Sequence, residues 1–289
     1  MYYNVAMNHL MRITKSDGST QLFEEEKLVS SLKKVGASPD VIDDIVDEVE
    51  KEMWEGIPTL DIYRRAFELL KKHSAPIAAK YSIRRAMFEL GPDGFPFEKF
   101  VARVFKLWGY ESITDQTLLG TCVEHEMDVV AWKDHDLAMA EVKFHNEFGL
   151  KSDLKVSLYV KARFDDLADT EFAYGGLKRK LTDRFLFTNT KFTEAAIQYG
   201  TCKGINMISW NYPADKSLHK IIDHNALYPI TCLVSLSHQQ KRDLINIGII
   251  ICSDLSANPD SLKVVGIHPE AIKVVLAEVA VIEKLKVNS

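Results

Sequence analysis

The alternation of apolar and polar residues is most regular in residues 128–144, which read DVVAWKDHDLAMAEVKF. The first five residues are an apolar run of strand formers, and residues 133–136 are a polar tetrapeptide suited to a four-residue turn. The remaining residues alternate with a period of two, which places Glu141 and Lys143 on one face of a second strand. The pattern therefore predicts a two-stranded β-hairpin with charged residues on an otherwise apolar face.

The pairing of this predicted hairpin brings two carboxylates together. If Trp132 and Leu137 close the turn, counting back along both strands puts Asp128 directly opposite Glu141. Cross-strand partners have Cβ atoms roughly 4.5–5.5 Å apart, and like charges in that position are destabilising. A divalent cation bound between the carboxylates would offset their repulsion. The alternative is a solvated hairpin face with ordinary charges, but the apolar residues on the same face favour the cation.

Turn signals divide the chain into three blocks, and the fold class that they predict is multi-domain α/β. The first block, 12–91, reads as a hairpin with an Asp-Gly turn at 16–19, followed by a helical bundle. Gly91-Pro92-Asp93-Gly94 separates it from the second block, 95–228. The third block, 229–289, is small and mainly helical.

Helical and strand periodicities give a coarse order of elements in each block. Helices are expected in the first block at 27–35, 39–54, 59–73 and 77–90. The second block is expected to contain a helix from 95 to 108, the hairpin, a helix at 154–167, a strand at 183–188, a helix at 193–199 and a strand at 205–210. This order, α-β-β-α-β-α-β, predicts a mixed sheet with helices on both faces.

Two helix-start signals organise the third block. Ser237 and Gln240 form a capping-box pattern, and Pro269 begins a helix that runs to about Lys284. Helix, glycine-containing turn and helix in this order faintly resemble helix-hairpin-helix DNA-binding modules. The block carries no net charge, so a packing or interaction role is an equal alternative.

Composition and charge limit the classes of function. The 289 residues carry a formal net charge of −5, which argues against nucleic-acid binding by the whole surface. No apolar run approaches the ~20 residues of a membrane span, the first dozen residues show no secretory signal, and the four cysteines are scattered. We therefore expect a cytoplasmic protein that does not enter a membrane. Basic residues gather locally, as a nucleic-acid contact or a solvated loop: Lys178, Arg179, Lys180, Arg184 and Lys191.

The first block resembles the ATP-cone, a nucleotide-binding module of ribonucleotide reductases and their repressors. The likeness rests on ITKSDG (13–18), FEEEKL (23–28) and AAKYSIRRAM (78–87), which match the order and spacing of the family's motifs. It covers nearly the whole block. The resemblance implies a small hairpin capped by helices, with ATP or dATP as a regulatory ligand. Because cone modules often work through assembly, it also implies a homo-oligomer.

The same resemblance implies a set of nucleotide-binding residues. Lys15 and Lys27 would face the phosphates, while Tyr81 and Arg84 would lie on the closing helix. Two lysines from separate elements that converge on one site are suitable phosphate ligands. The family usually has arginine after its first lysine, and this chain has Ser16 there. One cationic phosphate contact is therefore missing.

The second block resembles the PD-(D/E)XK nucleases, and within them the Mrr-type and Holliday-junction-resolvase-like enzymes. The matching segments are PFEKFVARVFKLWGYE (96–111), EMDVVAW (126–132), AEVKF (140–144) and FLFTNTKFTEAA (185–196). Their order, over about 100 residues, is that of the family. The glycine-rich approach to the metal-binding aspartate is replaced here by residues 122–126, CVEHE.

The residues of this resemblance form a candidate nuclease site. Asp128, Glu141 and the Val142 carbonyl offer the hard oxygen ligands that Mg²⁺ or Mn²⁺ prefers. Lys143 can position the attacking water or offset charge on the phosphorane. Glu98 would be an accessory ligand, directly or through water. The alternative for Glu98 is a helix-start residue that complements the helix dipole.

The sequence thus predicts a Mg²⁺-dependent deoxyribonuclease, an endonuclease on double-stranded DNA that ATP or dATP regulates at the N-terminal block. A nuclease of RNA or modified DNA would share the mechanism. The competing hypothesis is a nucleotide-sensing regulator that binds nucleic acid and retains an inactive nuclease fold. Opposed carboxylates beside a lysine favour catalysis, because a protein that only binds nucleic acid does not need them.

Overall fold

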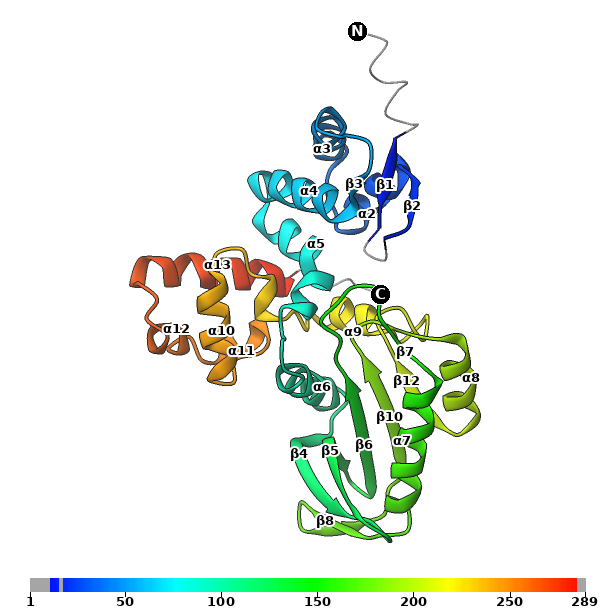
Figure 1. Ribbon diagram of the computed structural model, residues 1–289. Helices are drawn as coiled ribbons and strands as arrows, with labels where there is room; N and C mark the ends of the chain where they lie inside the picture. The colour runs from blue at the N-terminus through cyan, green and yellow to red at the C-terminus, as the bar shows by residue number, and fades with distance from the viewer. Residues whose placement is uncertain (1–10, 16–17, 285–289) are drawn as a thin grey trace.

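The computed structural model describes residues 11–15 and 18–284 (Figure 1). The first ten residues, in which the sequence shows no secretory signal, lie outside the described residues, as do Ser16 and Asp17 of the predicted turn. Three regions meet at one helix, α5 (Ala75–Phe88), drawn in cyan in Figure 1. The multi-domain α/β class is confirmed. Within the described ranges, no helix is long and apolar enough to cross a membrane.

The N-terminal region is the predicted hairpin with four helices. Its elements are β1 (Arg12–Thr14), β2 (Thr20–Leu22), α2 (Glu25–Lys34), α3 (Pro39–Lys51), β3 (Ile57–Pro58), α4 (Thr59–His73) and α5. Strands β1 and β2 pair antiparallel, and the helix ends differ from the prediction by at most three residues. Strand β3 pairs parallel with β1 and was not predicted, because two residues are too short for a periodic pattern.

The central region is a five-stranded mixed sheet in the order β12-β10-β6-β5-β4. Its elements are α6 (Phe95–Leu107), β4 (Glu111–Leu119), β5 (Glu124–Lys133), β6 (Asp136–Lys143), α7 (Leu154–Leu167), β10 (Asp183–Thr188), α8 (Glu194–Cys202) and β12 (Ile205–Ile208). Strands β4, β5 and β6 are antiparallel, and β6, β10 and β12 are parallel. Two small ribbons flank it: β7 (Lys151–Ser152) with β11 (Lys191–Phe192), and β8 (Phe172–Tyr174) with β9 (Leu177–Arg179).

The predicted α-β-β-α-β-α-β order was wrong in one respect, because β4 adds a third antiparallel strand before the hairpin. This strand is at the sheet edge and most of its side chains are exposed or half-buried. Its buried face therefore has too few apolar residues to show a period of two. With β4 included, the central region has the order α-β-β-β-α-β-α-β.

The hairpin register agrees with the prediction, whereas its turn is tighter. Trp132 pairs with Leu137, as predicted, but Lys133 and Asp136 also pair, which leaves a two-residue turn instead of four. Asp134 begins this turn with a φ of 49°. Aspartate tolerates the left-handed conformation that short hairpin turns require.

The period of two sends the residues of β6 into two separate cores. Leu137 and Met139 pack under α7 and α8, whereas Ala138 and Ala140 face the core that includes α6. Glu141 therefore lies on the side of the sheet that α7 covers. Helix α6 covers the opposite side.

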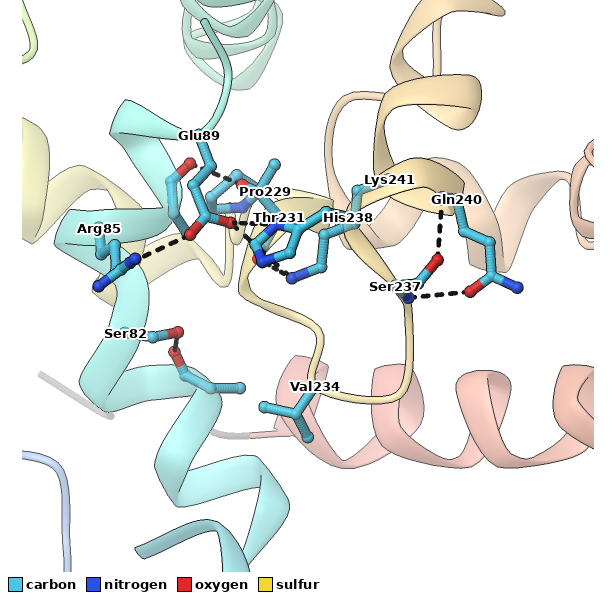
Figure 2. Close-up of polar contacts among 12 residues, drawn as sticks. Ser82, Arg85, Glu89, Pro229, Thr231, Val234, Ser237, His238, Gln240 and Lys241 are labelled. Atoms are coloured by element: carbon cyan, nitrogen blue, oxygen red, sulfur yellow. Dashed lines mark hydrogen bonds and ion pairs between the residues drawn. The ribbon is translucent and has the colours of Figure 1, made fainter. Parts of the chain in front are cut away.

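The C-terminal region is helical. It comprises α9 (Leu218–Asn225), the 3₁₀ turn η1 (Ile230–Cys232), α10 (His238–Asn246), α11 (Cys252–Ala257), α12 (Ser261–Val264) and α13 (Pro269–Lys284). The predicted capping box is present: the Gln240 N–H donates to Ser237 Oγ at 3.3 Å, and the Ser237 N–H donates to Gln240 Oε1 at 2.9 Å (Figure 2). The helix predicted from Pro269 to Lys284 is also confirmed.

Helix α5 belongs to both the N-terminal core and the core shared with the C-terminal helices. Ala78 packs in the N-terminal core, while Ile83 and Met87 pack in the core shared by α6, the sheet and the C-terminal helices. The Thr231 hydroxyl donates to the Ala86 carbonyl at 2.7 Å. Just after the helix, the Glu89 carboxylate accepts from Arg85 Nε at 3.2 Å beside Lys241 and His238 of α10 (Figure 2).

Removing a buried side chain of α5 should destabilise the protein strongly. Met87 is fully buried, so Met87→Ala should lower the free energy of unfolding by about 2–5 kcal/mol through lost burial and a residual cavity. Chemical denaturation monitored by circular dichroism measures this change. Val264→Ala, at a side chain 72% exposed, is the control and should stay within about 0.5 kcal/mol of wild type. Equal stabilities of the two variants would contradict the packing described for α5.

Candidate active site

Three carboxylates from three elements converge where β5 and β6 separate. Glu98 comes from the first turn of α6, Asp128 from β5 and Glu141 from the buried end of β6. The pKa of Glu98 is raised to about 7, first by burial and then by the charge of Asp128. The pKa of Asp128 is also raised to about 7, by burial and then by Glu141. Burial is the larger cause of both shifts, and the smaller contributions place Glu98 near Asp128 and Asp128 near Glu141.

Asp128 occupies a break in the sheet. The β4–β5 pairing includes Thr114↔Val129 and Gln116↔Met127 but omits Asp115, whose φ is 57°. On its other side, the pairing of β5 with β6 starts only at Val129, the residue after Asp128. The Val142 N–H of β6 therefore has no backbone partner on β5. The Asp128 carboxylate takes that role and accepts from the Val142 N–H at 2.6 Å. The break thus turns this carboxylate toward β6.

Glu141 is the most buried of the three carboxylates, with 2% of its surface exposed. One carboxylate oxygen pairs with the Lys143 ammonium and the other with the Arg163 guanidinium of α7. Arg163 also donates to the Glu126 carbonyl at 2.8 Å and contacts the Tyr159 hydroxyl. Glu141 is therefore held between two cations.

Arg163 is a site residue that the sequence analysis missed. It follows Tyr159 by four residues and Val160 by three, so it lies beside the apolar stripe of α7. A cation beside the apolar stripe of a helix that covers a sheet was the signal that could have indicated a contact with the sheet. Its partner on the sheet depends on how α7 packs, and the sequence pattern alone does not specify that packing.

The oxygen atoms of this site are of the kind that a hard divalent cation prefers as ligands. Asp128 and Glu141 supply carboxylate oxygens, and Glu98 supplies a third from the opposite face. Because the N–H and C=O of one strand residue point to the same edge, we expect the Val142 carbonyl to face Asp128 as well. However, no group of three or more Asp, Glu, His or Cys side chains in residues 11–15 and 18–284 is arranged as a ready metal cage. A cation at Glu141 would have to displace Lys143 or Arg163.

The chain that leaves β6 is fixed directly after Lys143. The buried Asn189 side chain accepts from the His145 N–H and donates to the His145 carbonyl, both at 2.9 Å. The His145 ring is 3.0 Å from the Ser152 hydroxyl. Asn189 follows β10, so the segment after β6 is tied to the neighbouring parallel strand. This segment sets where Lys143 lies.

Asp166 of α7 fixes residues 122–126, the segment that departs from the nuclease pattern. Its carboxylate accepts from the Cys122 N–H at 2.8 Å and the Val123 N–H at 3.2 Å, and it contacts the His125 ring at 2.8 Å. A Cβ at Gly120 would lie 2.3 Å from Asp166 Oδ2, so glycine is needed there. The unusual approach to Asp128 is thus held by an aspartate.

The residues predicted to bind nucleotide do not all meet. Lys15 and Arg84 line one cavity of about 630 Å³. Tyr81 does not line it, but stacks on Tyr63, which does, with ring centroids 5.3 Å apart. Lys27 is also outside the lining, and its exposed ammonium pairs with Glu24 at 2.8 Å.

The basic residues that the sequence places between 178 and 191 are divided between two ends of the central region. Arg179 is buried and donates from Nε to the Asp134 carbonyl of the hairpin turn at 2.7 Å, so it has a structural role. Lys191 instead lines the cavity that contains Lys15 and Arg84. These residues therefore do not form one surface patch.

Family models match both ends of the chain. The ATP cone domain model matches residues 11–87, which confirms the resemblance of the first block. A model described as AF1548-like, C-terminal, matches residues 228–283. The N-terminal region is therefore an ATP-cone domain. The candidate active site lies between the two matched segments.

Two relatives match about two thirds of this chain and nearly all of their own length. An uncharacterized protein of Archaeoglobus fulgidus is 35% identical over 179 residues, which are 62% of this chain and 97% of the relative. The crystal structure of the protein of unknown function AF1548 is 33% identical with a TM-score of 0.54, over 66% of this chain and 99% of that chain. The complex of Can2 from Sulfobacillus thermosulfidooxidans with cyclic tetra-adenylate aligns with a TM-score of only 0.31.

Burial of Glu98 near Asp128 predicts a pH-dependent loss of stability. The Glu98 pKa rises from 4.5 to about 7 on folding, so its ionisation destabilises the fold as pH rises through that interval. Glu98→Gln should therefore raise the melting temperature at pH 8 in EDTA and change it little near pH 4.5. Differential scanning calorimetry at both pH values tests this.

The exposed Glu124 provides a matched control for that measurement. Glu124→Gln removes a carboxylate from β5 without relieving a buried charge, so it should shift the melting temperature equally at both pH values. A Glu98→Gln shift that is likewise independent of pH would show that Glu98 is not held among like charges.

Proposed function

This chain belongs to the AF1548-like family, and from the site described above we propose that it is a metal-dependent nuclease that hydrolyses phosphodiester bonds. One observation carries the proposal: Glu98, Asp128 and Glu141 are gathered beside Lys143 at a break in a mixed sheet. Glu141 is paired with two cations, but Glu98 and Asp128 are partly buried without an ion-pair partner among the described residues, and a purely structural role does not account for them. The ATP-cone domain adds regulation by ATP or dATP.

The proposed cation is Mg²⁺ or Mn²⁺, held by Asp128, Glu141 and the Val142 carbonyl. When bound, it supplies a Lewis acid for a phosphate oxygen and a water of lowered pKa. Glu98, as an accessory ligand or through water, completes the oxygen donors on the α6 side. A cation at Glu141 would leave Lys143 without this partner, and the Lys143 ammonium could then face the phosphate.

The reaction assigned to these residues is the attack of water on phosphorus. The water oxygen forms a bond to phosphorus, the bond to the bridging sugar oxygen breaks, and that oxygen takes a proton from solvent. Glu98, where it acts through water and not as a direct ligand, can accept the proton that the attacking water releases. The Lys143 ammonium offsets the negative charge that builds on the phosphorane oxygens.

Double-stranded DNA is the proposed substrate, with RNA or modified DNA as chemically equivalent alternatives. The order α-β-β-β-α-β with carboxylates on the second and third strands supports a nuclease of the class that the sequence resembles. The net charge of −5 means that any contact with a phosphate backbone has to be local. Arg163 and Lys143 are the cations nearest the carboxylates.

A second candidate function is a nucleotide-sensing regulator that binds nucleic acid without cutting it. The observation that favours it is the occupied state of Glu141, whose two oxygens are already engaged by Lys143 and Arg163. In such a protein, the ion pairs would be structural and would persist in the presence of Mg²⁺. ATP binding and DNA retention without metal binding at Asp128 would identify this function.

Cleavage assays test the proposed nuclease. Plasmid, linear, single-stranded and branched DNA, and RNA, are incubated with Mg²⁺ or Mn²⁺, with and without ATP or dATP. Lys143→Ala and Asp128→Asn should each lower the cleavage rate by about 100-fold or more, as expected when one charge-stabilising group is lost. Lys133→Ala, an exposed lysine at the turn end of the same hairpin, is the matched control and should cut like wild type.

The nuclease proposal fails if wild type leaves every substrate intact under all these conditions. It fails equally if Lys143→Ala retains the wild-type rate, because the cutting would then come from another site or a contaminant.

A further inference from the structure

A cavity of about 630 Å³ lies between the ATP-cone region and the central region. One wall comes from the cone and includes Lys15, Tyr63 and Arg84. The other comes from the segments after β6 and β10 and includes Phe148, Lys151 and Lys191. No aspartate or glutamate among the described residues lines it. Its size is within the range of small-molecule sites, roughly 300–1,000 Å³.

Two lysines of the central region are placed directly opposite each other at this cavity. Lys151 of β7 and Lys191 of β11 are register partners in a two-stranded parallel ribbon, and both are exposed. Like charges at paired positions repel, and neither lysine forms an ion pair with a described carboxylate. The ribbon therefore concentrates positive charge without a protein counter-ion. An anionic ligand would supply one.

Arg84 adds a third cation that lacks an acidic partner. Its guanidinium lies 5.7 Å from the centroid of the Phe148 ring, and it forms no ion pair with a described carboxylate. Its Nε is buried without a hydrogen-bond partner, as is the Tyr63 hydroxyl on the same wall. Buried polar atoms are nearly always satisfied in folded proteins, so these atoms indicate a missing ligand.

We propose that this cavity is a composite nucleotide site, in which the cone and the central region together hold one nucleoside triphosphate. The polyphosphate would contact Arg84 and Lys15 from the cone and Lys151 and Lys191 from the ribbon, through charge-assisted hydrogen bonds. The base and ribose would lie against the apolar part of the wall, which includes Leu60 and Leu150.

The composite site gives the nucleotide a physical route to the candidate active site; this step rests on the proposed function. Phe148 stacks on Phe88 of α5 with ring centroids 3.9 Å apart, so the segment after β6 is already in contact with the cone. The same segment begins at Lys143 and is held at His145 by Asn189. A ligand that bridges Arg84 and Lys151 would fix this segment and with it the position of Lys143.

Isothermal titration calorimetry of the full chain with ATP, dATP and inorganic triphosphate tests the composite site. Lys151→Ala with Lys191→Ala should weaken binding of all three probes at least 10-fold, because two charge-assisted contacts are lost. Arginine at both positions should restore most of the affinity. Lys178→Ala with Lys180→Ala, two exposed lysines at the opposite end of the central region, is the matched control and should bind like wild type.

Two results would overturn the composite site. One is an affinity of the Lys151 and Lys191 double variant within twofold of wild type, which would confine the site to the cone. The other is the absence of ATP and dATP binding by wild type. Glu141→Gln separates this proposal from the nuclease: it should abolish cleavage and leave nucleotide affinity unchanged. A chain that cuts no nucleic acid but loses ATP affinity with the two lysines supports the composite site and rejects the nuclease.

Discussion

The packing of α5 against all three regions is the constraint on which the rest of the structure depends. Its first half completes the cone core through Ala78, and its second half is buried with the C-terminal helices through Met87. Its last residue, Phe88, stacks on Phe148 of the segment that leaves β6. A helix buried on several sides cannot shift without disturbing each neighbour, because interiors are close-packed. The ATP-cone domain and the region that carries the carboxylates are therefore mechanically joined.

Two charge clusters of opposite sign lie at the two ends of the segment after β6. At one end, Asp128 and Glu141 repel each other, and at the other, Lys151 and Lys191 do. Lys143 and Arg163 offset part of the repulsion in the first cluster, and in each cluster a ligand of the opposite charge would relieve the repulsion that remains. Proteins retain such repulsion mainly at functional sites, where perturbed titration is common. The chain thus has one place for a cation and one for a polyanion, connected by fewer than ten residues.

The period-two alternation of β6 was sufficient to predict the hairpin register, because register follows from a short turn, but the pairing ends at Val129 and Ala140, one position short of the predicted pair Asp128 and Glu141. Strand β4 was not predictable in the same way, since an exposed edge strand has few buried positions. Arg163 was missed because its contact with Glu141 depends on the packing of α7 over the sheet. The composite cavity was also beyond the sequence pattern, because Arg84 and Lys191 meet only through the packing of two regions.

Nucleotide binding to the cone is proposed to fix the segment that follows the carboxylate strand. Amide hydrogen exchange of the full chain, with and without saturating ATP, measures this directly. We expect ATP to slow exchange in residues 144–152 of the central region together with residues around Arg84 at the end of α5. Slower exchange confined to residues 11–73, with residues 144–152 unchanged, would contradict it.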